Sequence, residues 1–156
     1  MPRGRLGRYP SPTVVAVALV VTALDAATKA WARAELATHP AHVGGLVWLR
    51  LRYNSGLSFS VRPAGSIATT VLTLAVALGV VVVGLRARGG APAIGFGLLI
   101  GGGLANAVDR LAASPHRVTD FVAVGSFPVF NLADAAITAG FVVLVVVALR
   151  GERLLA

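Results

Sequence analysis

The chain has 156 residues, of which 56% are hydrophobic and 13% are charged, and its formal net charge is +8. A mean hydropathy of +0.82 excludes an ordinary soluble globular domain and indicates an integral membrane protein. Because one helical crossing takes about 20 residues, this length fits three to five transmembrane helices. We expect a single membrane domain over residues 1–156.

The residue types that are scarce exclude several kinds of site. The chain has no cysteine, which rules out disulfides, thiol nucleophiles and thiolate metal sites. Its three histidines, His39, His42 and His116, have no HxxxH or HExxH spacing, so we expect no metal site and no cofactor. The arginines flank apolar stretches without interleaved aromatics, which favours membrane phospholipid over nucleic acid as the partner of the positive charge.

Four apolar stretches, each near the length of a helical crossing, follow one another along the chain: residues 13–31, 67–85, 91–108 and 129–149. They predict an all-α integral membrane protein with four transmembrane helices. A cleaved signal peptide is the alternative for the first stretch, because three arginines precede it. We favour a retained helix, since no small-x-small cleavage site follows directly and Asp25 and Lys29 stand at i and i+4 on a continuing helix.

Four crossings place both termini on one side of the membrane, and the arginines indicate which side. Seven arginines lie in the terminal segments and in the tight turn at residues 86–90, whereas six are spread over the longer loops opposite. The positive-inside rule therefore favours cytoplasmic termini. We expect residues 1–12 to form a cytoplasmic tail, and residues of about 32–66 and 109–128 to form the outer loops.

The first outer loop contains an alternating pattern that a helix would not show. Apolar and polar or aromatic residues alternate over residues 47–53, and a similar pattern follows the turn-like Asn54-Ser55-Gly56 at residues 57–61. This pattern predicts a β-hairpin. Residues 118–122 are sufficiently β-branched to join it, which would carry Asp120 on a strand. We expect a small extracytoplasmic sheet over the mouth of the helical bundle.

Polar residues from separate segments fall on the outer side of this four-span topology: Asp25, Lys29, Asn54, Asn106, Asp109, Arg110, Asp120, Asn131 and Asp134. Polar groups that meet near one membrane interface mark a site more often than they mark scattered helix caps. Structural interpretations remain for some of them. We favour simple ion pairs for Asp25 with Lys29 and for Asp109 with Arg110, and close helix packing for the glycines at 101–103.

Two aspartates in this set, Asp120 and Asp134, stand fourteen positions apart in a chain with only six acidic residues. Two carboxylates that meet are the equipment of an aspartic hydrolase. Asn131 and Asp134 also have the spacing of an N-cap and an N3 acid, so the sequence favours a helix cap and a catalytic role about equally for this pair. Asp120 has no comparable structural explanation, because its β-branched and aromatic neighbours make a poor turn.

The chain resembles the bacterial lipoprotein signal peptidases, or type II signal peptidases, in five segments that occur in the family's order. They are DAATKAW at 25–31, NSGLSF at 54–59, GGGLANAVDR at 101–110, VTDF at 118–121 and FPVFNLADA at 127–135. The departures are small. Ala105 stands where the family usually has glycine, and Leu57-Ser58 replaces a more alanine-rich pair.

The resemblance implies an aspartic endopeptidase of the bacterial cytoplasmic membrane, with its active site at the extracytoplasmic face. Its substrate would be a lipid-modified prolipoprotein, cut immediately before a cysteine that carries diacylglyceryl. The resemblance assigns Asp120 and Asp134 as the catalytic dyad that activates water. It assigns four substrate-binding residues, Asn54, Asn106, Arg110 and Asn131. It implies no cofactor, and nothing in the sequence suggests an obligate interface, so we expect a monomer.

A small ion- or proton-conducting transporter subunit is the alternative. It would need charged residues through the full depth of the membrane. The cytoplasmic halves of the expected spans contain none. A purely structural membrane subunit would leave the converging acids and amides unexplained, so we favour the peptidase.

Overall fold

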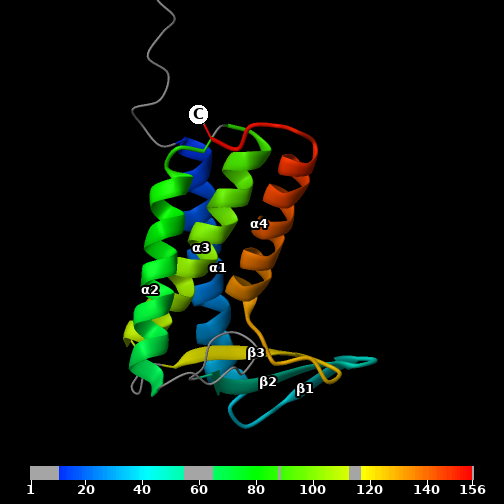
Figure 1. The fold of residues 1–156 in the computed structure, drawn as a ribbon. Coiled ribbons are helices and arrows are strands. Elements are labelled where there is room, and N and C mark those ends of the chain that lie inside the picture. The colour runs from blue at the N-terminus through cyan, green and yellow to red at the C-terminus, as the bar shows by residue number, and fades with distance from the viewer. Residues whose placement is uncertain (1–10, 55–64, 88, 113–116, 156) are drawn as a thin grey trace, which may run out of the picture.

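The computed structural model describes residues 11–54, 65–87, 89–112 and 117–155. Along the chain they form α1 (Pro12–Glu35), β1 (Ala41–Gly44), β2 (Val47–Asn54), α2 (Gly65–Gly84), α3 (Ala91–Ala112), β3 (Val118–Val124) and α4 (Leu132–Leu149). The helices form a bundle with the sheet at one end (Figure 1). The start of α1 and the end of the described chain lie at the opposite end, remote from the sheet.

The helices coincide with the four apolar stretches expected from the sequence. Within the described residues, α1, α3 and α4 are long and apolar enough to cross a membrane. α2 has 20 residues, and Leu74–Gly84 is the apolar part identified where its side chains are described. A mostly helical, membrane-type protein is therefore confirmed, and the fourth crossing stays a prediction.

The outer faces of the helices are apolar, as they are in helices that contact lipid. Leu19 on α1, Leu78 on α2 and Phe141 on α4 are each more than half exposed. A soluble protein rarely exposes so much contiguous apolar surface. The surface of the bundle thus agrees with the membrane class that composition indicated.

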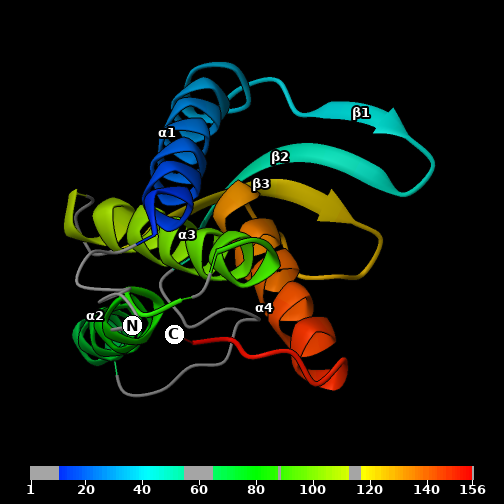
Figure 2. The same ribbon diagram turned by 90° about the horizontal axis from the view of Figure 1, so that it is seen from above.

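Helix α3 lies at the centre of the bundle and packs against α1, α2 and α4 (Figure 2). Its glycines allow this approach. A Cβ at Gly101 would lie 2.7 Å from Cβ of Val21, and one at Gly102 would lie 2.5 Å from the carbonyl oxygen of Ala133. Close helix packing is therefore confirmed for these two glycines, whereas a Cβ at Gly103 would make ordinary contact, 3.6 Å from Ala77.

The sheet is antiparallel with the order β1-β2-β3. β2 pairs with β3 from Val47 opposite Val124 to Asn54 opposite Val118, with an irregularity between Leu49 and Arg52. The predicted strand over 47–53 and the participation of residues 118–122 are confirmed. The described hairpin partner of β2 is the preceding strand β1, which the sequence did not indicate. The predicted second strand at 57–61 lies outside the described residues.

Two sets of contacts attach the sheet to the helices. Phe121 of β3 is buried with Ala32 and Leu36 at the end of α1, and its ring meets that of Trp31 edge-on at 6.2 Å. Val122 and Phe130 exchange backbone hydrogen bonds of 2.8 and 2.9 Å. Because Phe130 lies two residues before the first residue of α4, β3 is tied to the N-terminal end of that helix.

Candidate active site

The N-terminus of α4 is closed by a capping box. The Oδ1 atom of Asn131, the N-cap residue, accepts a hydrogen bond from the Asp134 N–H at 2.9 Å, and the Asn131 N–H donates to Asp134 Oδ2 at 3.2 Å. This arrangement satisfies backbone groups that the helix itself leaves unpaired. The N-cap interpretation of the Asn131 and Asp134 spacing is therefore confirmed.

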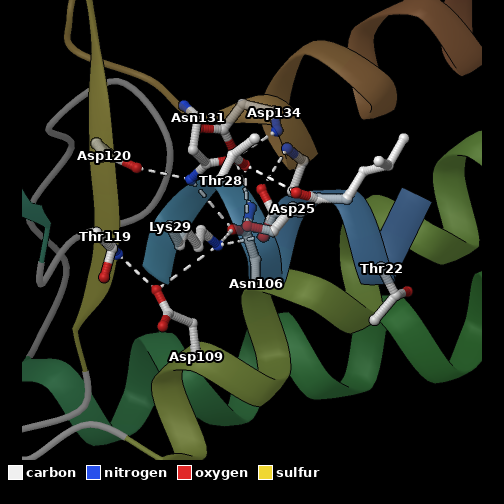
Figure 3. Close-up of polar contacts among 12 residues, drawn as sticks. Thr22, Asp25, Thr28, Lys29, Asn106, Asp109, Thr119, Asp120, Asn131 and Asp134 are labelled. Carbon is white, nitrogen blue, oxygen red and sulfur yellow. Dashed lines mark hydrogen bonds and ion pairs between the residues drawn. The ribbon is translucent and has the colours of Figure 1, made fainter. Parts of the chain in front are cut away.

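Asn131 also reaches the second aspartate. Its Nδ2 atom donates to Asp120 Oδ1 at 2.7 Å, and Asp120 on β3 is only 1% exposed. One side chain thus bonds to the backbone of Asp134 and to the carboxylate of Asp120 (Figure 3). The tie between β3 and Phe130 holds the strand close enough for this contact.

Asn106 of α3 links the site to the centre of the bundle. Its Nδ2 atom donates to Asp134 Oδ1 at 2.9 Å. Its Oδ1 atom accepts from Lys29 Nζ at 2.9 Å and from Asn131 Nδ2 at 3.2 Å. The Asp134 carboxylate therefore accepts one hydrogen bond on each oxygen, one from the backbone and one from an amide side chain.

The environment of Asp120 favours its neutral form. The pKa of this carboxyl is raised from its ordinary value to about 7, mainly by burial and in smaller part by the nearby charge of Asp134. Hydrogen bonds from Asn131 and Asn54 and the positive charge of Lys29 oppose the shift. In this environment the Asp120 carboxyl keeps its proton to a higher pH than an exposed aspartate does.

The remaining residues expected at the site lie around this cluster. Asn54 ends β2 and hydrogen-bonds to Asp120. Arg110 is buried on α3, one turn after Asn106, within electrostatic reach of Asp120 and Asp134. The structure therefore brings all six of the expected side chains to the end of the bundle that carries the sheet, although they come from β2, β3, α3 and the start of α4.

A cavity of about 450 Å³ opens beside Asp134. Its wall is mostly apolar, with Asn54 and Asp134 among its polar members, and the segment from Phe127 to Phe130 forms one side. Among the described residues no group of three or more histidine, aspartate or glutamate side chains is placed to hold a metal ion. The cavity can take an extended apolar segment, and the Asp134 carboxylate meets it at the wall.

Asp25, Lys29 and Asp109 make more contacts than the simple ion pairs that the sequence predicted. The Asp25–Lys29 ion pair is confirmed at 2.7 Å, but Lys29 also bonds to Asn106. Asp109, expected to pair with its neighbour Arg110, has ion pairs across the bundle with Arg33 at 3.2 Å and Lys29 at 3.6 Å. The i, i+4, i+8 spacing of residues 25, 29 and 33 was the available sequence signal, because it puts all three on one face of α1.

The family model described as "Signal peptidase (SPase) II" matches residues 17–150 of the chain. The protein belongs to the signal peptidase II family. Lipoprotein signal peptidase of Rhodococcus jostii is 40% identical over 143 residues, which cover 86% of this chain and 71% of that protein. The Mycobacterium avium protein of the same name is 34% identical, covering 88% and 79%. The chain spans 61% of the Mycolicibacterium smegmatis relative, at 36% identity.

Two solved structures, both described as bacterial membrane enzymes, have the same fold. One has a TM-score of 0.79 at 21% identity, covering 94% of this chain and 93% of its own. The other has a TM-score of 0.76 at 22% identity, covering 94% and 98%. As a signal peptidase II family member, the chain is a protease of lipoprotein processing with membrane-type helices, and this favours the peptidase over the transporter subunit.

Proposed function

We propose that this signal peptidase II is an aspartic endopeptidase that uses Asp120 and Asp134 to cleave diacylglyceryl-modified prolipoproteins immediately before the lipidated cysteine. The observation that carries the proposal is the double contact of Asn131, which joins the Asp120 carboxylate to the N-terminus of α4 where Asp134 stands. The raised pKa of Asp120 supports it, because an aspartic hydrolase needs one protonated and one ionised carboxyl.

The environments of the two acids differ in a way that suggests their roles. Asp134 lies in the first turn of α4, where the helix dipole and the donors from Asn131 and Asn106 favour a carboxylate. Asp120 is buried on β3 and favours the protonated form near neutral pH. We therefore assign Asp134 as the base and Asp120 as the acid, within a pair that titrates as a unit.

Cleavage then needs only the dyad and one water molecule. The Asp134 carboxylate takes a proton from water as the water oxygen attacks the scissile carbonyl carbon, while Asp120 donates its proton to the carbonyl oxygen. The tetrahedral intermediate collapses with cleavage of the C–N bond, and the proton held by Asp134 passes to the departing amine. Loss of the hydroxyl proton restores protonated Asp120, so no acyl-enzyme forms.

The proposal places the substrate in the apolar cavity beside Asp134. An apolar signal segment suits its wall, and the amide of Asn54 offers a donor and an acceptor to an extended peptide backbone. Arg110 and Asn106 do not line this cavity, and we propose that they contact the substrate beside the dyad. We further propose that α2 forms the fourth crossing, that both termini are cytoplasmic and that phospholipid surrounds a monomer whose site faces away from the cytoplasm.

The test is cleavage of a precursor peptide with a diacylglyceryl cysteine by the purified protein, followed by mass spectrometry of both products. Asp120→Asn and Asp134→Asn should each lower the rate by about 10²- to 10⁴-fold, since general acid–base catalysis contributes a factor in that range. Glu152→Gln, which alters an exposed carboxyl near the C-terminus, is the control and should cleave normally. Substantial activity in either aspartate variant would show that Asp120 and Asp134 are not a catalytic dyad.

A further inference from the structure

A second pair of aspartates lies behind the proposed dyad. Asp25 Oδ1 accepts a hydrogen bond of 2.8 Å from the N–H of Ala133, the residue before Asp134. Asp109 Oδ2 accepts one of 2.6 Å from the N–H of Thr119, the residue before Asp120. Each of these two rear acids, Asp25 and Asp109, thus accepts a hydrogen bond from the backbone N–H of the residue that precedes a dyad acid in the sequence.

Lys29 joins the two rear acids (Figure 3). Its Nζ atom lies 2.7 Å from Asp25 Oδ2 and 3.6 Å from Asp109 Oδ2, and the side chain is 2% exposed. Arg33 adds a contact of 3.2 Å to Asp109 Oδ1 and donates to Thr119 Oγ1 at 2.9 Å. One face of α1 therefore carries the charges that connect β3, α3 and the start of α4.

Lys29 helps to fix how the amide of Asn106 is oriented. An ammonium group has donors only, so it must face the amide oxygen. Lys29 Nζ and Asn131 Nδ2 both donate to Asn106 Oδ1, which directs the Nδ2 atom of Asn106 to Asp134 Oδ1. Loss of the lysine would remove the shorter and the only charged of these two donors.

Stability alone is a weak explanation for this network. Burying a lysine and carboxylates costs desolvation that often exceeds the attraction between them, and apolar replacements of buried ion pairs are often neutral or stabilising. The N–H groups at a helix start are commonly satisfied by local caps or water. Here a carboxylate from another helix holds one of them, which constrains where α4 begins relative to α1.

We propose that Asp25, Lys29 and Asp109 are positioning residues that fix the separation and orientation of Asp120 and Asp134, with Lys29 as the shared member. The identity of the dyad rests on the function proposed above. Displacement of a reacting group by about 1 Å can cost about 10²-fold in rate, so a network of this kind acts on turnover more than on substrate binding.

The first experiment measures kcat and KM for the lipidated precursor, per folded enzyme, in the full chain. Asp25→Ala and Asp109→Ala should each lower kcat by about 10²-fold with KM changed by less than about threefold. Asp25→Asn and Asp109→Asn keep an oxygen for the same N–H and should recover at least about a tenth of wild-type kcat. Glu35→Ala removes an exposed carboxylate of the same helix and is the matched control.

A second variant keeps the buried charge balanced in case the alanine variants fail to fold. Asp25→Asn combined with Lys29→Met removes one charge of each sign and leaves Asp109 paired with Arg33. We expect a folded protein whose kcat is at least about tenfold lower, because Asn106 and Asp109 both lose their contact with the ammonium group. A kcat within about threefold of wild type in this variant would overturn the role of Lys29.

Amide hydrogen exchange gives a readout that does not depend on cleavage. Asp109→Asn should leave the Thr119 N–H protected, and Asp109→Ala should expose it to faster exchange, with the same contrast at Ala133 for Asp25. If Asp120→Asn is inactive while the folded alanine variants keep wild-type kcat, the positioning proposal is wrong and the dyad stands. If Asp120→Asn is active, the proposed function fails whatever the exchange data show.

Discussion

Asn131 serves the helix and the site with the same side chain. Its Oδ1 atom caps α4 and its Nδ2 atom donates to Asp120 and Asn106. The capping box engages Asp134 Oδ2 and leaves Oδ1 for Asn106. A carboxylate has two oxygens, so the cap and catalyst interpretations of Asp134 are compatible.

Substitution of Asn131 can separate these two roles. Asn131→Ala should lower the free energy of unfolding by about 1–2 kcal/mol through loss of the cap, and should also lower the cleavage rate. Asn131→Ser keeps a good N-cap but lacks the amide that donates to Asp120, so it should retain stability and still lose activity. Denaturant unfolding and precursor cleavage measure the two effects. A serine variant with wild-type turnover would show that the amide bridge is dispensable.

The raised pKa of Asp120 predicts how activity depends on pH. If Asp120 is the acid, kcat/KM should fall as pH rises through about 7, because the carboxyl of the free enzyme loses the proton that it must donate. The measurement is a pH–rate profile at precursor concentrations well below KM. A rate that stays constant from pH 6 to 9 would assign the acid role elsewhere.

The same pKa predicts a pH dependence of stability with a definite sign. Between the ordinary value of 3.8 and about 7, the folded protein binds more protons at Asp120 than the unfolded chain does. The contribution of Asp120 to the free energy of unfolding therefore falls as pH rises through this window, by at most about 4 kcal/mol. Asp120→Asn should gain stability relative to wild type over the same range. If the free energies of unfolding of wild type and Asp120→Asn changed in parallel with pH, the raised pKa of Asp120 would be contradicted.

At the scale of elements, α3 sets the spacing of the bundle through its glycines. Gly102→Ala would put a Cβ 2.5 Å from the carbonyl oxygen of Ala133, so α3 and α4 must separate at the start of α4. We expect a loss of about 1–3 kcal/mol in unfolding free energy, as for other overpacked interiors, together with reduced cleavage. Unfolding in detergent and precursor cleavage provide the measurements.

Gly103→Ala is the matched control for this prediction. Its Cβ would make ordinary contact, 3.6 Å from that of Ala77, and alanine raises helix propensity by up to about 1 kcal/mol. The variant should therefore be as stable as wild type or more so. Equal behaviour of the two alanine variants would mean that the α3–α4 contact adjusts without cost.

The sequence predicts elements well where the signal is local and poorly where it depends on pairing. Long apolar stretches located the helices, alternation located β2, and β-branched residues located β3. β1 escaped prediction because all four of its residues are exposed and its strand conformation depends on pairing with β2. Helix α4 starts at Leu132 rather than 129, because Phe130 is extended where it bonds to Val122.

The site was predictable in its side chains and not in its backbone contacts. Charges and amides are rare in an apolar chain, so Asp120, Asp134 and Asn106 stood out as residues that meet at one interface. The N–H groups of Ala133 and Thr119 carry no signature in the sequence, yet they are what Asp25 and Asp109 hold. The substrate came from the family resemblance, since residue spacing contains no information about a lipidated cysteine.

On the scale of the whole molecule, the sheet lies at one end of the bundle, and the start of α1 and the end of the described chain lie at the other. Cytoplasmic termini therefore imply that the sheet faces away from the cytoplasm. The cysteine-free sequence allows single-cysteine labelling with no background. In intact cells, a membrane-impermeant maleimide should label Val43→Cys in β1, which is 63% exposed. It should label Glu152→Cys only after permeabilisation, and the reverse pattern would invert the proposed orientation.

The bridge between Val122 and Phe130 closes the intervening chain into a small ring. The bridge that closes the ring lies two residues after Asp120 and directly before Asn131. Phe127, at the far side of the ring, lines the cavity. Gly125 in this ring has φ of 52°, which disfavours any side chain there, so variation is open at positions 126–128. A library restricted to these three positions should alter which signal peptides are accepted while the carboxylates keep their contacts.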